Sequence, residues 1–369
     1  MVTGVISYNL TNASYAKWSS SVESKNIIKL SVKSGMNATE FATKTVGTNG
    51  LEQITHTIDN TLQVDERFAT EYRYRGGNSV VKNYVTFNNE TWRIIGIIPT
   101  EDTDGNVENR FKIIRDESIG NYVWDDDTAI TYKYEENNDS LKLLENNDVD
   151  SSIKYDNSYK IVKTAAPIIN VDCSNCGNNW ARPSALNTYL NNIYYNSLDV
   201  IAKNMIGTTK YYLGGKGNTY NADVMWQAER KNDANRSGYY YGTNPVMQSD
   251  ASKKIALMYT SDYGYGALDQ CYDEYHGSDY DAYEECMKNN DWLYLNRGQW
   301  TISQGTEEYF GVGVGANGGI CQGLDSEGIG EHFLVVNSNA IRPTLIISSN
   351  VKISGGEGTS QKPYTLSVK

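Results

Sequence analysis

The chain has no long apolar run, and it is poor in proline and histidine. Only 6 of its 369 residues are Pro and 3 are His. No stretch approaches the roughly 18 apolar residues that a membrane helix needs, so we expect no membrane insertion within this chain. The residues that follow Met1 are too short a run for the apolar core of a signal peptide. If the protein is exported, we therefore expect its signal or anchor to have been removed from this sequence.

Positive charge is scarce as well. The chain has 33 Lys and Arg against 45 Asp and Glu, which gives a net charge of −12. Because phosphate binding needs a basic patch, we expect neither nucleic acid nor an anionic membrane surface as a partner. Tyrosine, in contrast, is abundant: 29 Tyr and 7 Trp are part of a hydrophobic share of only 39%. Such rings fill a core or cover a binding surface, and the sequence predicts a folded protein.

Recognisable catalytic motifs are missing. The chain contains no Gly-x-Ser-x-Gly, and its three histidines, His56, His276 and His332, fall in unrelated segments. The glycine-rich stretch 311–319 has no Lys-Ser/Thr and precedes no helix, so it is not a phosphate loop. We predict that the protein is not an enzyme, although a secreted hydrolase stays an alternative.

The chain divides by composition near residue 66. Residues 1–66 are rich in Ser, Thr and Asn and weakly apolar, which indicates an N-terminal stalk or linker. Residues 67–369 are predicted to form one α+β domain. Its expected strands and helices are, in chain order, a hairpin over 83–98 that turns at Asn88-Asn89 and ends at Pro99, a strand at 111–115, helices near 183–190, from Ser197 to Met205 and over 221–231, strands at 254–259, 299–303, 309–314, 332–336 and 341–347, and a closing hairpin over 351–366.

One of these helices is predicted from its cap and its apolar face. Ser197 is expected to cap the helix that carries Leu198, Ile201, Ala202 and Met205 on one face. Residues 125–160 are acidic and Asn-rich, and we expect them to form an exposed insertion.

Several blocks resemble a family of exported surface proteins from low-GC gut bacteria (Firmicutes and Mollicutes), over roughly residues 52–366. The blocks are 72–78, 84–96, 112–120, 210–215, 255–266, 291–294, 299–302 and 341–345. The early Trp-Arg-Ile-Ile, the late Trp-Thr-Ile and the closing Arg-Pro-Thr-Leu are similar to C-type-lectin-like domains, which the sulfatase-modifying enzymes share. The resemblance implies antiparallel sheets with two or three short helices, paired domain ends, and a long irregular insert between the late strands. It supplies no catalytic motif.

The resemblance also indicates where a ligand would bind. The late insert, near 302–340, is expected to contact it through polar and acidic side chains: Glu307, Glu308, Asn317 and Asp325. This stretch is glycine-rich here, where relatives would be richer in Tyr and Ser. Clustered tyrosines beside Gly and Ser have the composition of adaptable binding surfaces, so we expect further contacts from Tyr239, Tyr240, Tyr241, Tyr263 and Tyr265. A Tyr-rich packing layer is the alternative, whereas Trp92, Trp292, Trp300 and Tyr259 are predicted to lie in the core.

Five cysteines are present. Cys173 and Cys176 form a CxxC in loop-like sequence, for which we predict a small disulfide, with redox chemistry or half a zinc site as alternatives. Cys271 and Cys286 are predicted to form a second disulfide around an acidic loop, as fits an oxidising compartment. Cys321 remains as a lone thiol, which does not meet the sulfatase-modifying enzymes' need for a reactive cysteine pair.

No cofactor is expected, although the sequence leaves calcium binding open. The acidic loop between Cys271 and Cys286 contains Asp273, Asp279 and Asp281, and Ca²⁺ takes carboxylate oxygens. A solvated acidic loop is the alternative. The segment 102–108 resembles the start of a calcium loop, but Ile113 stands where an EF-hand carries its bidentate Glu, and a polar hairpin loop fits better.

Together these features predict an extracellular or cell-surface-attached binding protein. We expect an adhesin or receptor-like module that binds an extracellular glycan or protein without catalysis. A structural subunit of a surface appendage, such as a minor pilin, is a further alternative.

Overall fold

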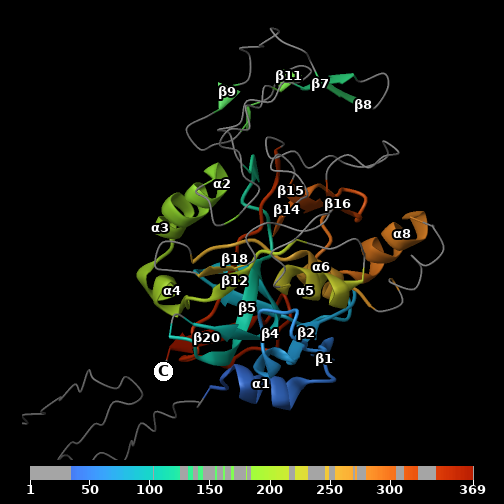
Figure 1. Cartoon of the computed structure of the whole chain (residues 1–369). Coiled ribbons are helices and arrows are strands. Elements are labelled where there is room, and N and C mark those ends of the chain that lie inside the picture. Colours follow the sequence, from blue (N-terminus) through green and yellow to red (C-terminus); the bar gives the residue numbers. More distant parts are fainter. Residues whose placement is uncertain are drawn as a thin grey trace, which may run out of the picture.

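A computed structural model gives the fold of the chain (Figure 1). It describes residues 35–102, 104–124, 132–135, 140–143, 154–155, 161–162, 168–169, 180, 184–215, 221–231, 246–248, 254–268, 271, 280–304, 311–322 and 338–368. Strands and short helices are mixed along this chain, and the strands pair mostly antiparallel, so the α+β prediction is confirmed at this level.

The larger sheet is built around one long strand. Its strands are β1 (Leu51–Thr55), β2 (Thr70–Tyr74), β3 (Tyr84–Phe87), β4 (Glu90–Glu101), β5 (Val107–Arg115), β18 (Thr344–Ile346), β19 (Val351–Gly355) and β20 (Tyr364–Val368). One edge of β4 pairs with β5, and the other pairs first with β3 and then with β2. Beyond β3 come β20 and β19, and β18 pairs with the far edge of β5.

Four smaller groups of strands complete the β-structure. The second sheet has the order β16 (Ile320–Gln322), β15 (Gly311–Val314), β14 (Gln299–Gln304), β17 (Asn339–Ala340) and β6 (Asn121–Tyr122). The others pair β12 (Lys210–Tyr212) with β13 (Val246–Gln248), β9 (Lys154–Tyr155) with β10 (Ile161–Val162), and β7 (Tyr132–Glu135) with both β8 (Ser140–Leu143) and β11 (Ile168–Ile169).

The helices are short. They are α1 (Ala38–Thr45), the 3-10 turn η1 (Glu66–Phe68), α2 (Ala185–Thr188), the π-helical turn η2 (Tyr189–Tyr194), α3 (Tyr195–Ser197), α4 (Val200–Met205), α5 (Ala222–Arg230), α6 (Thr260–Gly266) and α8 (Tyr280–Asn290). Among the described residues no helix has the length and apolar character to cross a membrane.

The predicted first hairpin is confirmed, but its second strand continues further than expected. Asn88 and Asn89 both adopt positive φ, 52° and 58°, as such a turn requires. Pro99, expected to end the strand, lies inside β4 opposite Asn109. Pairing between β4 and β2 stops at Ile97, so Pro99 interrupts no ladder on that side.

Close backbone approach explains a glycine in the same strand. The β4–β5 register shifts between Ile94 and Gly96, as it does at a β-bulge. A Cβ at Gly96 would lie 2.2 Å from the carbonyl oxygen of Tyr72 on β2. Only glycine therefore lets β2 pair with β4 at this bulge.

The predicted stalk is not separate from the domain as far as it is described. From residue 35 onward it packs into the main core: Phe41 and Leu51 are fully buried, and the backbone of Met36 pairs with that of Ile353. β1 pairs with β2 along its length. The boundary expected at residue 66 is therefore wrong for residues 35–66, because their apolar side chains complete the core of the larger sheet.

Other sequence predictions differ in detail. The helix expected over 221–231 is α5, and Asn221 caps it: its side chain accepts hydrogen bonds from the backbone N–H groups of residues 223 and 224. For α4 the cap is Asp199 rather than Ser197, and Ile201 is 64% exposed instead of facing the core. Residues 254–259 form a single bridge, at Ala256, rather than a strand. The strand expected at 332–336 lies outside the described residues.

Aromatic rings dominate the core. Trp124 packs edge-to-face on both Trp180 and Trp300, with ring centroids 5.4 and 5.6 Å apart. The rings that were predicted to be internal are confirmed: Trp92, Trp292, Trp300 and Tyr259 are each at most 5% exposed. The tyrosine and tryptophan content thus compensates for the low aliphatic content.

Candidate functional site

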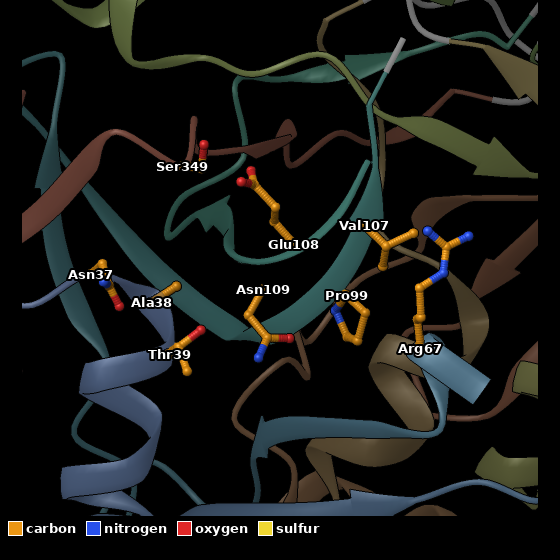
Figure 2. Close-up of a pocket in the computed structure, with 9 residues that line it drawn as sticks. All are labelled: Asn37, Ala38, Thr39, Arg67, Pro99, Val107, Glu108, Asn109 and Ser349. Carbon is orange, nitrogen blue, oxygen red and sulfur yellow. The ribbon is translucent and has the colours of Figure 1, made fainter. Parts of the chain in front are cut away.

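A polar cleft opens where α1 meets the β4–β5 hairpin (Figure 2). Its volume is about 390 Å³, within the 300–1,000 Å³ typical of ligand sites. The residues that line it come from α1, η1, β4, β5 and the turn before β19, and they are Asn37, Ala38, Thr39, Arg67, Pro99, Val107, Glu108, Asn109 and Ser349. Four segments distant in the sequence thus form one surface feature.

The α1 side of the cleft is fixed by a capping box. The Asn37 side chain accepts a hydrogen bond from the Glu40 N–H at 2.9 Å, and the Glu40 carboxylate accepts one from the Asn37 N–H at 3.1 Å. This reciprocal pair satisfies backbone donors at the start of the helix. The hydroxyl of Thr39 is thereby held at the rim on a rigid element (Figure 2).

The two charged groups of the cleft already have partners. Arg67 donates to both oxygens of Asp65, with distances of 3.0 Å from Nε to Oδ1 and 2.8 Å from Nη2 to Oδ2. This bond lowers the pKa of the Asp65 carboxyl. Glu108 accepts from Nη2 of Arg110 at 3.2 Å. Both pairs are partly exposed and contribute little stability, but they leave the cleft close to electrically neutral.

A buried ionic network links β2, β5 and α6. Asp262 accepts from Nη1 of Arg73 and from Nζ of Lys112, the latter at 2.5 Å. Arg73 also donates through Nε to Glu71 at 2.7 Å. Burial opposes ionisation of Asp262, but the neighbouring cations Lys112 and Arg73 outweigh it and lower its pKa. The sequence block 72–78 gave no indication that its arginine would be internal.

His56 extends this network. Its ring nitrogens contact Glu71 at 3.1 Å and Asp223 at 2.8 Å, and the ring stacks on Trp226 with centroids 3.7 Å apart. Burial lowers its pKa, yet the hydrogen bonds to Asp223 and Glu71 dominate and raise it. The sequence had placed His56 in the stalk, so its role in the core was missed.

Glu229 joins the network from α5. It accepts hydrogen bonds from the N–H and the hydroxyl of Ser261, at 3.0 and 2.7 Å, and from Nη1 of Arg230 at 2.9 Å. Burial raises its pKa. Because these carboxylates bind groups of their own chain, the network joins α5 and α6 to the larger sheet and acts as a support, not as a ligand surface.

Two tyrosines predicted to bind a ligand are internal. Tyr263 is 0% exposed and donates to the carbonyl of Gly318 at 2.9 Å, and Tyr265 is 5% exposed and donates to Asp223 at 3.3 Å. The expectation of exposed rings is therefore wrong for this pair, and the alternative of a packing layer holds. The tyrosines at 239, 240 and 241 lie outside the described residues.

The predicted contacts of the late insert are only partly described. Asn317 is half-buried and lies in the turn between β15 and β16, where its side-chain oxygen accepts from the N–H of Gly319 at 3.1 Å. Glu307, Glu308 and Asp325 lie outside the described residues. None of the insert's described residues borders the cleft.

The predicted second disulfide is present: Cys271 and Cys286 are joined with Cα atoms 5.4 Å apart. Cys173 and Cys176 lie outside the described residues, as do two of the three predicted metal ligands, Asp273 and Asp279.

Asp281, the third predicted ligand, stands in α8. Within the part of the chain that the structure describes, no group of three His, Cys, Asp or Glu is placed to hold a metal. Calcium binding therefore stays a prediction.

Comparison with known proteins identifies no relative. No family model matches the chain, and neither a curated protein nor a solved structure is significantly similar to it. The geometry of the cleft and of the network therefore carries the functional argument.

Proposed function

We propose that this protein is an exported, cell-surface ligand-binding module with a C-type-lectin-like domain, and that it binds a hydroxyl-rich ligand such as a glycan without catalysis. The observation that carries the proposal is the cleft of about 390 Å³ between α1 and the β4–β5 hairpin. Its residues differ from the late insert that the family resemblance favours, so the cleft is a second candidate surface beside that insert.

The chemistry of the cleft suits a neutral, hydroxyl-rich ligand. The amide of Asn109 and the hydroxyls of Thr39 and Ser349 are groups that both donate and accept hydrogen bonds, as sugar hydroxyls do. Pro99 and Val107 supply the apolar contact that the carbon face of a sugar ring would need. Since its charged groups are internally paired, neither a strong anion nor a strong cation is favoured.

Export is supported by the disulfide. Cys271 and Cys286 form a bridge, and such bridges persist in oxidising compartments outside the cytosol. The net charge of −12 agrees with a partner that is not a polyanion.

The test is binding of the full chain to glycan and mucin arrays, with and without a calcium chelator. Thr39→Trp places an indole at the rim of the cleft, and we expect it to abolish binding. The matched control is Thr43→Trp, which changes an exposed threonine one turn later on the same helix and outside the cleft. Circular dichroism and thermal unfolding of both variants would show that each is folded.

The outcomes separate the alternatives. Binding lost only in Thr39→Trp supports the cleft. Binding that both variants retain would place the ligand elsewhere, with the late insert next to be tested. Loss on chelation would add a cation to the site. If the unaltered chain binds no glycan or mucin, the proposal of a glycan ligand is wrong, and a protein receptor or an appendage subunit takes its place.

A further inference from the structure

A lysine and an aspartate of the ionic network touch each other inside the fold, away from the cleft. Nζ of Lys112 lies 2.5 Å from Oδ2 of Asp262, and their side chains are 4% and 0% exposed. Lys112 stands inside β5, which pairs with β4 on one edge and β18 on the other. Asp262 stands in the first turn of α6. Because both elements are packed, the fold fixes the contact between two residues 150 positions apart.

The amine is close enough to the carboxyl carbon to react with it. One carbon–oxygen bond of about 1.2 Å separates Cγ from Oδ2, so Nζ of Lys112 lies at most about 3.7 Å from Cγ. Groups that react with each other efficiently are held about 3–3.5 Å apart. The ring of Tyr259, with its centroid 4.2 Å from Nζ, confines the amine beside Asp262. The pair is therefore held close to the geometry that amide formation needs.

The carboxyl oxygens face donors that would stabilise the reaction. Nη1 of Arg73 donates to Oδ1 of Asp262, and the backbone N–H of Tyr259 donates to Oδ2 at 2.7 Å. When an amine adds to Cγ, negative charge develops on these oxygens, and donors already in place stabilise it. Burial lowers the pKa of Lys112 by more than Asp262 raises it, which favours the neutral amine that acts as a nucleophile.

The ion pair contains every atom that condensation requires. One ammonium proton moves from Nζ to Oδ2, and the freed lone pair of Nζ forms the bond to Cγ. A second proton follows as the bond between Cγ and Oδ2 breaks, and Oδ2 leaves as water. The third proton stays on the amide nitrogen, while Oδ1 becomes the amide carbonyl oxygen that faces Arg73. The step needs no oxidant, cofactor or second substrate.

The surroundings favour the product over the ion pair. A buried ion pair carries a desolvation penalty that a neutral amide does not. A small cavity of about 30 Å³, lined by Lys112, Arg73 and Tyr259 among others, has room for the water that is released. Removing one positive and one negative charge leaves the neighbours paired, since Arg73 keeps Glu71 at 2.7 Å.

We propose that Lys112 and Asp262 condense in the folded protein to an isopeptide bond, an amide between Nζ and Cγ, with the loss of one water. The bond would fasten β5 to α6 and add a covalent link to the Cys271–Cys286 disulfide. Like a disulfide, it would close a long loop and constrain the unfolded chain. Neither residue lines the cleft, so the cross-link does not depend on the proposed ligand binding.

The test is mass spectrometry of the full chain after reduction and denaturation. We expect an intact mass below that of the sequence by one water. Trypsin should not cut after Lys112, and it should release a branched peptide in which residues 111–115 are joined to residues 255–288. The full sequence mass with normal cleavage after Lys112 would overturn the proposal and leave an ion pair. A missing water without the branched peptide, as an aspartyl succinimide gives, would overturn it as well.

Two lysine variants locate the bond. Lys112→Arg keeps the positive charge but has no primary amine, and we expect it to have the full mass of its own sequence. The matched control is Lys210→Arg, since Lys210 also contacts a carboxylate, Glu101 at 2.7 Å, but in a partly exposed pair. This control should still lack one water and give the branched peptide. A full mass in Lys210→Arg would contradict the assignment, and if Lys112→Arg does not fold, the branched peptide of the unaltered chain decides.

Discussion

His56 is the residue of the ionic network whose usual pKa lies closest to neutral pH. Both of its ring nitrogens face carboxylates, Glu71 and Asp223, which lie 15 and 167 residues away in the chain. The stacked indole of Trp226 covers the ring. The charged imidazolium therefore has two acceptors in the fold that it lacks in the unfolded chain.

We predict that His56 makes stability depend on pH above neutrality. Its pKa is raised in the folded state, so its contribution is complete below about pH 6.5, the usual unfolded value, and is lost as pH rises through the folded pKa. Each unit of that difference contributes about 1.4 kcal/mol. Urea unfolding from pH 5 to 9 should show the loss in the unaltered chain.

The control is His56→Gln, which keeps a polar side chain but cannot titrate. Its free energy of unfolding should lack this decline, and its loss of stability in acid should be smaller, because His56 is itself a partner that lowers the pKa of Asp223. There the pKa of Asp223 is lowered in the fold, so its contribution is present above about pH 4 and is lost as pH falls. Parallel curves for the two proteins above pH 6.5 would contradict the assignment.

The burial of a single side chain was predictable where the residue type and its sequence neighbours indicate the same environment. Trp92 and Trp300 were assigned to the core because rings in apolar strands are buried. Tyr263 and Tyr265 were misassigned because their neighbours, Gly264 and Gly266, suggested a loop. Glycine is a poor helix former, yet α6 forms, since Asp262 accepts from the N–H of Tyr259 at 2.7 Å and anchors the helix start to buried cations.

At the scale of elements, the Cys271–Cys286 disulfide is a covalent link that holds α8 to the rest of the fold. It joins Cys271 to Cys286 in α8 across a sequence separation of 15. Closing a loop of that length constrains the unfolded chain and stabilises the fold by about 3 kcal/mol. The acidic segment between the two cysteines would otherwise gain much conformational freedom on unfolding.

We predict that reduction lowers the unfolding midpoint without changing the fold. The measurement is thermal unfolding with and without a reductant, beside a Cys271→Ser, Cys286→Ser double variant. The double variant should match the reduced protein and be insensitive to reductant. If it still responds, a second disulfide exists, for which Cys173 and Cys176 are the predicted pair.

Element boundaries were less predictable than element types. The helix before Gly207 was expected, but Ser197 and Asp199 are both good caps two residues apart. Asp199 is the cap in the structure, because its side chain accepts a hydrogen bond from the N–H of Ala202 at 2.6 Å. With the helix starting there, Ile201 lies on the exposed face. Similarly, a proline ends a strand only where a neighbouring strand would need its backbone N–H, which proline lacks. Sequence alone does not show which side of β4 is paired at Pro99.

At the scale of the whole molecule, the ends of the described chain close the larger sheet. The backbone of Met36 pairs with Ile353, and β20 lies parallel to β3. Figure 1 shows α1 and β20 at the same end of the molecule. The family resemblance led us to expect paired ends. The composition of residues 35–66 did not indicate that they add side chains to the core, since α1 buries only one large side chain, Phe41.

One contact between the ends can be tested directly. Phe41 of α1 lies edge-to-face against Tyr364 of β20, with ring centroids 5.2 Å apart, and against Phe111 of β5 at 5.5 Å. Phe41 is fully buried and Tyr364 is 6% exposed. If residues 35–66 were a stalk, Phe41→Leu would leave the rest of the domain as stable as before.

We predict instead that Phe41→Leu and Tyr364→Leu each lower the free energy of unfolding of the entire domain, in a single transition, by about 1–3 kcal/mol. Their double-mutant cycle should give a coupling of about 0.5–1.5 kcal/mol, because each leucine removes one ring of an aromatic pair. As a control, Ile302→Val in the second sheet should add to Phe41→Leu within about 0.5 kcal/mol.

Additive effects at 41 and 364, or a separate transition for the N-terminal part, would show that the ends fold independently. Coupling with one transition would place α1 inside the cooperative unit that positions the cleft, so that ligand binding and closure of the domain would depend on the same packing.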